Sequence, residues 1–277
     1  RPDAAWNLSE MEHVLHDHLP SAPWMQPATR RLPGVQPLAM ADWLIRDEAF
    51  PGQMALRDDL IATRRDAVFR AGPDTRAARA EVLALVLKTL DDGYTRDARG
   101  VTRPDGVTVD LDADDPLLVA GRLVQADLCI LSSPAPGQDP VLTDAILCFP
   151  ASWTLAEKIG HPLARIHVPV ASYTEDMARR VRRLFDALRP GQPLWRQNAL
   201  LYADPALYQP RPEVQPRVTP AARPDYLRSE RQVLIRLPDT GAVLFAIHTF
   251  VLPFAALTPD QMAALEVHPI EYAGRSA

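Results

Sequence analysis

Two histidines, His161 and His167, lie in the segment of the chain that is richest in side chains able to do chemistry. His167 stands in the apolar motif Ile-His-Val-Pro-Val, and His161 follows the glycine that ends an expected short helix. Neutral imidazole is the commonest side-chain ligand of metal ions, and an apolar wall suits the flat face of a porphyrin. A buried histidine bonded to a backbone carbonyl is a more frequent use of the same residue. The residue pattern alone therefore leaves a ligand and a structural histidine both open.

A second group of histidines lies near the start of the chain, where His13, His16 and His18 alternate with Glu12 and Asp17. This spacing could begin a zinc or iron site, but the segment offers no convincing fourth ligand. The sequence therefore favours a solvated face of a helix for this group.

The two cysteines, Cys129 and Cys148, are too few for a disulfide framework and form no CxxC pair. Cys148 could supply the thiolate ligand that some haem enzymes use, but its apolar neighbours are typical of a buried thiol. Such sparse cysteine usage is typical of a reducing compartment, and Arg1 is not followed by the apolar core of a signal peptide. We therefore expect a cytoplasmic protein.

Composition excludes several classes of protein. The net charge of -5 gives no general attraction for nucleic acid or for an anionic membrane surface. No apolar run reaches the roughly 18 residues of a membrane-spanning helix. The glycine-rich fingerprints of dinucleotide-binding and P-loop proteins and the serine-hydrolase motif do not occur. With 47% hydrophobic residues, the chain can bury a substantial core.

Apolar spacing predicts helices early in the chain and strands later. The first 50 residues, with three tryptophans and several prolines, are typical of an arm that wraps around a domain. Helical periodicity covers most of 50–90, and a turn-rich stretch with a short strand at 107–111 follows. This order indicates an α+β fold. Further expected elements are helices at 155–159 and 175–188, and strands at 128–131, 145–149, 233–237 and 242–250, the last two forming a hairpin.

Eight short motifs, which follow one another across roughly residues 30 to 255, resemble the alpha subunit of haem-dependent oxidative N-demethylases. Each motif is weak by itself, and their ordered co-occurrence makes the resemblance specific. They are Leu-Pro-Gly-Val from residue 32, Gln-Met-Ala-Leu-Arg-Asp-Asp-Leu from 53, Gly-Arg-Leu-Val-Gln-Ala-Asp-Leu-Cys-Ile-Leu from 121, Cys-Phe-Pro-Ala-Ser-Trp from 148, Glu-Lys-Ile-Gly from 157, Ile-His-Val-Pro-Val from 166, Leu-Arg-Ser-Glu-Arg-Gln from 227 and Thr-Gly-Ala-Val-Leu-Phe from 240.

The resemblance implies a PAS-like antiparallel sheet with flanking helices, in which residues 1–100 form a helical N-terminal extension packed on a core of residues 101–277. It also implies haem b and the oxidative removal of a methyl group from a small alkylamine such as dimethylamine, with dioxygen, releasing formaldehyde. Electrons would come from NADPH through a partner reductase that carries FMN and a [2Fe–2S] cluster. The alternative is a haem-based PAS-like sensor, or a binding protein without catalysis.

The same resemblance suggests roles for individual residues. His167 is the expected ligand of the haem iron, with His161 as the alternative. Lys158, Arg228 and Arg231 are expected to pair with the haem propionates, because a cation favours those carboxylates. Glu230 is expected to orient Arg231 or to deliver protons in catalysis, and a purely structural ion pair is the other interpretation of this residue.

The chain departs from the family pattern in three places, which puts the substrate more in doubt than the fold. Arg196-Gln-Asn-Ala stands where Arg-x-Asn-Trp is expected, and Tyr208 stands in place of a histidine. In the last strand, His248-Thr-Phe replaces a more familiar Arg-Thr-Tyr.

Overall fold

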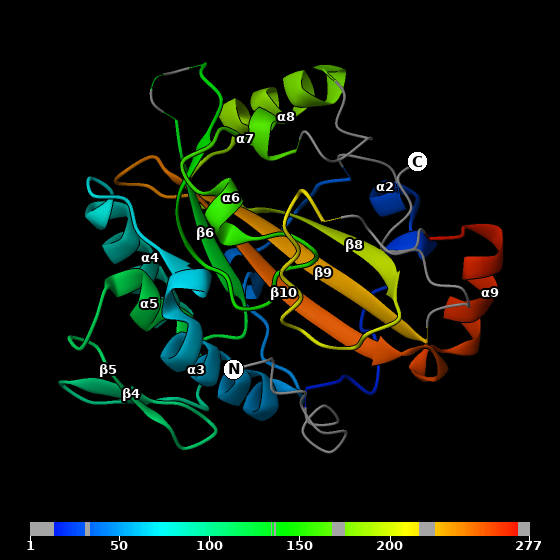
Figure 1. Ribbon diagram of the computed structural model, residues 1–277, viewed down its shortest axis with the longest axis horizontal. Helices are drawn as coiled ribbons and strands as arrows, with labels where there is room; N and C mark the ends of the chain where they lie inside the picture. The colour runs from blue at the N-terminus through cyan, green and yellow to red at the C-terminus, as the bar shows by residue number, and fades with distance from the viewer. Residues whose placement is uncertain are drawn as a thin grey trace.

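The structure, a computed structural model, describes residues 14–30, 34–133, 135, 137–167, 175–215 and 225–270. Within these residues it contains a seven-stranded antiparallel sheet with the order β1-β8-β9-β10-β6-β7-β2 and a three-stranded sheet with the order β3-β4-β5 (Figure 1). The strands are β1 (Gln36–Pro37), β2 (Phe69–Arg70), β3 (Thr95–Arg96), β4 (Gly100–Thr102), β5 (Thr108–Asp110), β6 (Asp127–Ser132), β7 (Val141–Ile146), β8 (Leu194–Tyr202), β9 (Tyr226–Arg236) and β10 (Val243–Pro253).

The helices lie mostly between these strands in sequence. They are η1 (Pro23–Met25), α2 (Pro27–Arg30), η2 (Met40–Asp42), α3 (Phe50–Val68), α4 (Arg76–Thr89), α5 (Pro116–Gly121), α6 (Leu155–Lys158), α7 (Leu163–Ile166), α8 (Glu175–Ala187), η3 (Phe254–Ala256) and α9 (Pro259–Val267). The mixture of helices with an antiparallel sheet confirms the predicted α+β class. No helix in the described part of the chain is both long enough and apolar enough to cross a membrane.

The long hairpin of β9 and β10 forms the centre of the large sheet. The backbone N–H of Leu237 donates to the carbonyl of Ala242, and Gly241 takes a positive φ of 69°, which a residue without a Cβ adopts at little cost. The predicted hairpin is therefore confirmed, although each strand is longer than its apolar run suggested. Strand β8, which was not predicted because its polar and apolar side chains do not alternate, pairs with β9 along its length.

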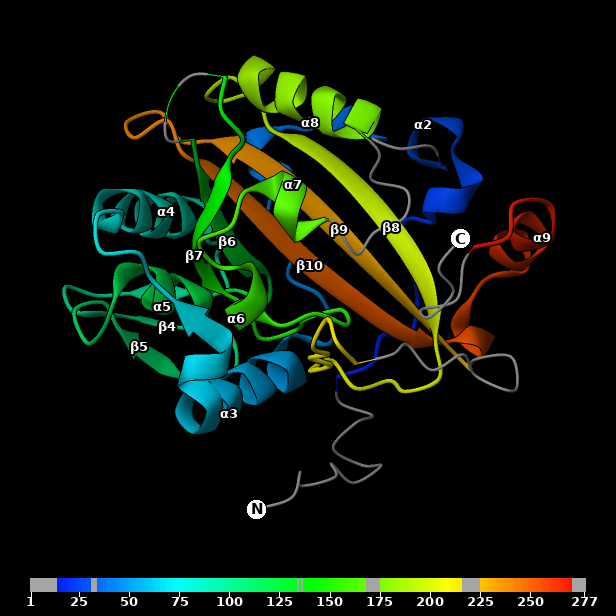
Figure 2. The same cartoon turned by 45° about the horizontal axis from the view of Figure 1, so that its top comes forward.

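The two faces of the large sheet carry different layers. Leu234, Phe245 and Cys129 lie directly opposite one another on three strands, and they pack with apolar side chains of α6, α7 and α8. Their neighbours along β9, Val233 and Ile235, point to the other face and pack with α4 and α5. Figure 2 shows α6 and α7 in front of β9 and β10, with α8 beside β8. We name the first surface the α7 face and the second the α4 face.

Strand β7 ends earlier than the apolar run at 145–149 predicted. The N–H groups of Cys148 and Phe149 donate to the buried carboxylate of Asp127, at 2.8 and 2.9 Å, and the N–H of Leu147 donates to the carbonyl of Val68. These three N–H groups do not continue the hydrogen-bonding pattern of β7, because they donate to the Asp127 carboxylate and to the Val68 carbonyl instead. The thiol of Cys148 is fully buried, and burial raises its pKa to about 12, which agrees with the structural role predicted for it.

The solvated-helix interpretation of the N-terminal histidines is wrong for the part that the structure describes. Residues 14–22 form no helix, and the N–H of His16 donates to the carbonyl of Val251 on β10. His16 is 2% exposed because its ring packs over the sheet, whereas His18 remains exposed. His13 lies outside the described residues. Strands β1 and β2 form the two edges of the large sheet, and the boundary expected at residue 100 stays a prediction.

Candidate cofactor site

His167 lies at the C-terminal end of α7, above the α7 face of the sheet. Its Nδ1 is 2.8 Å from the carbonyl oxygen of Leu163, one helical turn earlier. A carbonyl can only accept, so Nδ1 carries the proton and Nε2 carries the lone pair of the neutral ring. Burial lowers the pKa of His167; the bond to Leu163 opposes this shift, and the nearby positive charges of Lys158 and Arg196 add to it. The ring is therefore neutral at physiological pH, as a metal ligand must be.

Local sequence explains why this histidine is held in place. Gly160 takes a positive φ of 76° and ends the α6 turn, and Pro162 then precedes α7. Leu163 anchors α7 in the apolar cluster beneath α8. The carbonyl of His161 accepts from the N–H of Leu142, while the His161 side chain is exposed. The two histidines thus differ in burial, because the His161 side chain is exposed and that of His167 is half-buried.

The middle of the α7 face is polar, because β8 and β9, which are neighbours in the sheet, place the charged side chains of Arg196 and Glu230 there. Arg196 lies opposite Gln232, which is two residues from Glu230 on the same side of β9. Burial lowers the pKa of Arg196, and the negative charge of Glu230 opposes that shift. No residue in the described ranges gives the Arg196 guanidinium a hydrogen bond or an ion pair. Arg196 is half-buried, and a cation that is partly removed from water gains from an anionic partner.

Glu230 is the centre of a small hydrogen-bonded patch next to Arg196. Its Oε2 accepts from the side-chain amides of Asn198, at 3.2 Å, and Gln232, at 3.0 Å. Thr249 lies directly across from Glu230 on β10, and its buried hydroxyl finds no hydrogen-bond partner among the described residues. The patch therefore presents an anionic carboxylate beside an unsatisfied hydroxyl.

The three cations that the sequence suggested for haem propionates lie in different places. Lys158 Nζ donates to the carbonyl of Ile166 at 2.8 Å and to Glu213 at 2.5 Å. Hydrogen bonds from Arg165 and Lys158 lower the pKa of Glu213 to about 2. Lys158 is thus near His167 but already has a carboxylate partner.

Arg228 and Arg231 are three residues apart on β9, so their side chains point to opposite faces of the sheet. Arg228 lies on the α7 face and donates to the carbonyls of Leu207 and Phe149, at 3.0 and 2.6 Å. Arg231 lies on the α4 face and donates to the carbonyls of Asp42 and Trp43, at 2.7 and 3.2 Å. The structure thus groups Lys158, Arg228 and Glu230 with His167 on one side and places Arg231 on the other.

Sequence reasoning missed Arg196 and Thr249 as site residues. Recognition of β8 as a strand would have placed Arg196 and Asn198 on one face by their two-residue spacing. The sequence also contained no sign that Asp47 and His248 lie together, because 201 residues separate them.

Comparison with known families gives one match. A family described as "Haem-dependent oxidative N-demethylase, alpha subunit-like" matches residues 34–271 of this chain. The matched region contains His167, Arg196 and Glu230 and begins after His16.

Proposed function

The chain belongs to the haem-dependent oxidative N-demethylase alpha subunit-like family, and on this premise we propose that it binds haem and oxidatively demethylates a small alkylamine. The observation that carries the proposal is the family match, which spans 34–271 and includes the histidine of the α7 layer. The family description names an alpha subunit, which implies that a further subunit works with it.

The residues present on the α7 face fit a haem group. A neutral imidazole whose Nδ1 is fixed by a carbonyl is a common arrangement for a metal ligand, and His167 has it. The half-buried guanidinium of Arg196, which pairs with no described residue, suits a propionate, because a cation that is partly removed from water gains from an anion that it can reach. The apolar side chains of α6, α7 and α8 supply a wall for the porphyrin. In this proposal Arg196 takes the propionate role that was expected for Arg231.

Haem, when bound, would supply the redox chemistry by which dioxygen oxidises an N-methyl group. The chain's own residues have three tasks around it. His167 would hold the iron, while the carbonyl of Leu163 fixes the orientation of the ring. The apolar cluster excludes bulk water, and Arg196 neutralises a carboxylate.

Glu230 is proposed to hold the amine substrate. A secondary amine is an alkylammonium ion at neutral pH, and a carboxylate that is largely removed from water, as Glu230 is, favours such a cation. The two amides that donate to Oε2 fix the carboxylate and leave Oε1, which is 3.8 Å from Arg228 Nε, for a further donor. The unsatisfied Thr249 hydroxyl lies on the same side of the sheet and is a second polar contact for the substrate.

The overall reaction fixes what a partner must provide. Removal of one N-methyl group as formaldehyde, with reduction of the second oxygen atom to water, consumes one dioxygen, two electrons and two protons. The chain carries no dinucleotide fingerprint, and its two cysteines are buried and free, so neither can serve an iron–sulfur cluster from this chain. We propose that NADPH, FMN and a [2Fe–2S] cluster reside on the reductase subunit.

The experiment that tests the proposal is an absorption spectrum of the purified chain followed by an amine assay. We expect a haem Soret band, and formaldehyde release from dimethylamine when dioxygen and a reductase are present. A Soret band without formaldehyde from any secondary or tertiary methylamine would support the sensor alternative. A colourless protein that does not take up added haemin contradicts the proposal altogether.

A further inference from the structure

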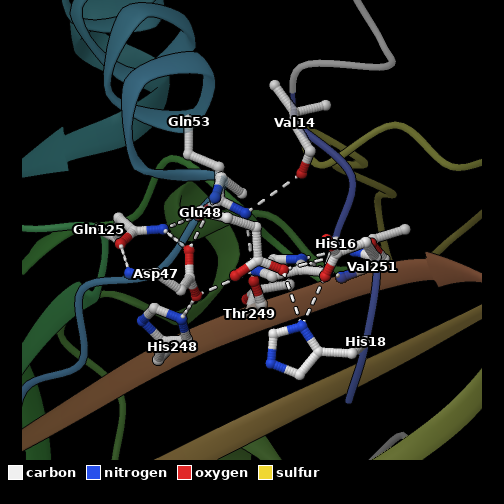
Figure 3. Close-up of polar contacts among 12 residues, drawn as sticks. Val14, His16, His18, Asp47, Glu48, Gln53, Gln125, His248, Thr249 and Val251 are labelled. Atoms are coloured by element: carbon white, nitrogen blue, oxygen red, sulfur yellow. Dashed lines mark hydrogen bonds and ion pairs between the residues drawn. The ribbon is translucent and has the colours of Figure 1, made fainter. Parts of the chain in front are cut away.

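A buried cluster of His16, Asp47 and His248 lies on the α4 face, on the opposite side of the sheet from His167. Asp47 Oδ2 is 3.0 Å from His16 Nε2 and 2.8 Å from His248 Nε2, and the three ligand-type atoms all lie within 4.8 Å of one another (Figure 3). The residues come from the N-terminal segment, the loop before α3 and strand β10. Three segments far apart in sequence thus aim their polar atoms at one point.

The cluster is closed off from water and supported from behind. His16 is 2% exposed and His248 is 3% exposed. The other oxygen of Asp47, Oδ1, accepts from the Gln125 side chain at 2.7 Å and from the N–H of Ala49 at 3.1 Å. Such hydrogen bonds to the far oxygen fix the orientation of a ligating carboxylate.

Burial and hydrogen bonding set the charges of the cluster when no metal is bound. Burial alone would raise the pKa of Asp47, but hydrogen bonds from His16 and His248 outweigh it and hold that pKa far below its usual range. Burial lowers the pKa of His248, against the opposing effect of Asp47, and the positive charge of Arg231 adds to the lowering. Asp47 is therefore ionised, and His248 is neutral, at physiological pH.

We propose that His16, Asp47 and His248 form a binding site for a first-row divalent transition-metal ion such as Zn²⁺, separate from the haem site. Two imidazoles and one carboxylate are ligands that zinc and its neighbours prefer, whereas magnesium and calcium select oxygen alone. With metal–ligand bonds of about 2.0–2.2 Å in tetrahedral geometry, adjacent ligand atoms lie about 3.3–3.6 Å apart. The two N···O separations, 3.0 and 2.8 Å, are somewhat shorter, so an ion between these atoms requires the side chains to move apart only slightly.

Metal binding requires each histidine ring of the cluster to move its proton from one ring nitrogen to the other. Each ring must give up the proton on Nε2 and carry one on Nδ1 instead. For His16, Nδ1 lies 3.2 Å from the backbone nitrogen of Val251 and 3.3 Å from its carbonyl oxygen, so a proton on Nδ1 exchanges the hydrogen bond accepted from the N–H for one donated to the carbonyl. For His248, Nδ1 is buried and has no partner among the described residues, so it can take the proton without breaking a bond. A metal ion bound here would connect the N-terminal segment, the loop before α3 and strand β10.

A neighbouring group gives a matched control. Asp17, His18 and Glu48 offer the same kinds of ligand atoms, also within 4.8 Å of one another, but all three residues are exposed. We assign no site to them, because exposed acidic groups of this kind are common without an ion.

The test uses the full chain with its haem, dialysed against a chelator and then titrated with Zn²⁺ or Co²⁺. We expect one Zn²⁺ per chain by elemental analysis, and a visible absorption band when Co²⁺ replaces it. Asp47→Asn and His248→Gln should each weaken Zn²⁺ binding at least about 10-fold, while His18→Ala leaves it unchanged. His167→Ala should lose haem and keep the Zn²⁺, which separates this proposal from the proposed function.

Two outcomes would overturn the site. One is a wild-type chain that binds no stoichiometric Zn²⁺ and gives no Co²⁺ band. The other is Zn²⁺ binding that survives Asp47→Asn but is lost in His18→Ala, which would assign the ion to the exposed group. Circular dichroism of each variant checks that the chain is folded, and the wild-type titration decides the question even if a variant does not fold.

Discussion

Two regions on opposite faces of the same sheet place histidines beside charged side chains, and they differ in how far those side chains have converged on one another. On the α4 face, both oxygens of Asp47 accept hydrogen bonds, and two of the donors are histidines. On the α7 face, the half-buried Arg196 guanidinium makes no hydrogen bond or ion pair with a described residue, and the buried Thr249 hydroxyl has no partner among them either. A buried polar atom without a partner, such as the Thr249 hydroxyl or Nδ1 of His248, normally gains one from outside the chain.

This difference separates two kinds of candidate site. The α7 face has one imidazole with a fixed orientation and unsatisfied polar groups around it, so a large organic cofactor with its own anionic groups fits there. The α4 face has ligand atoms that already converge, so only an ion small enough to replace two protons fits. The four predictions below test this contrast, from the largest expected effect to the smallest.

The largest effect is expected from the removal of the ligand on the α7 face. His167→Ala should abolish the Soret band of the reconstituted protein, because no other described histidine with a carbonyl-fixed Nδ1 lies on that face. His161→Ala, at an exposed position, and Asp47→Asn, on the other face, should keep it. The measurement is the absorbance spectrum after haemin titration. Equal loss in His161→Ala would transfer the ligand role to that residue.

The second prediction compares a fully buried arginine that has a carboxylate partner with a half-buried one that has none among the described residues. Arg57 is fully buried and pairs with the buried Asp127 at 2.9 Å, so Arg57→Met leaves a carboxylate without its cation. We expect a loss of about 3 to 5 kcal/mol in the free energy of unfolding. Arg196 has no such partner, so Arg196→Met should not destabilise the haem-free protein and should weaken haem binding by about 10-fold.

Urea unfolding of the haem-free chains checks this pair, and haemin titration checks the affinity. An Arg196→Met variant that unfolds as readily as Arg57→Met would mean that the guanidinium stabilises the chain itself. In that case the argument from its missing partner would not hold.

The sequence predicted those features that depend on residues close together in the chain, and it missed those that depend on residues far apart in it. Local patterns located α8 and the β9–β10 hairpin, because helical periodicity and a Thr-Gly turn act over neighbouring residues. The sequence did not separate Arg231 from Arg228, because the predicted strand began at residue 233 and the three-residue spacing places two side chains on opposite faces only within a strand. It assigned His16 to a solvated surface, because the acceptor that buries this ring, Asp47, is 31 residues away.

The third prediction concerns the substrate patch. Glu230→Gln removes the negative charge and keeps the size of the side chain and its contact with Asn198. We expect the KM for an alkylamine to rise by about 10-fold, because an ion pair with the ammonium ion is lost, while the Soret band is unchanged. Steady-state formaldehyde release at varied amine concentration measures this. Gln232→Ala is the control, since it removes a hydrogen-bond donor to the carboxylate and leaves the charge of Glu230 in place. An unchanged KM in Glu230→Gln would mean that Glu230 has a structural role only.

The smallest effect is a pH dependence that should have opposite signs at two histidines. Burial, with Asp47 opposing, lowers the pKa of His248 in the folded state, so the neutral ring contributes stability that is complete above the unfolded pKa of about 6.5 and is lost as the pH falls. The hydrogen bond to Asp17 raises the pKa of His18, so that ring contributes stability below about 6.5 and loses it as the pH rises.

These signs can be measured by urea unfolding between pH 5 and 8 with a chelator present. His248→Gln should flatten the fall in unfolding free energy at low pH, by at most about 1.4 kcal/mol per pH unit for the one proton involved. His18→Gln should change the slope in the opposite direction and by less, because His18 is exposed and solvent screens its ion pair. If His248→Gln follows the wild-type curve across this range, the buried ring is not resisting protonation, and the view of the α4 cluster as a neutral, preorganised set of ligands must be abandoned.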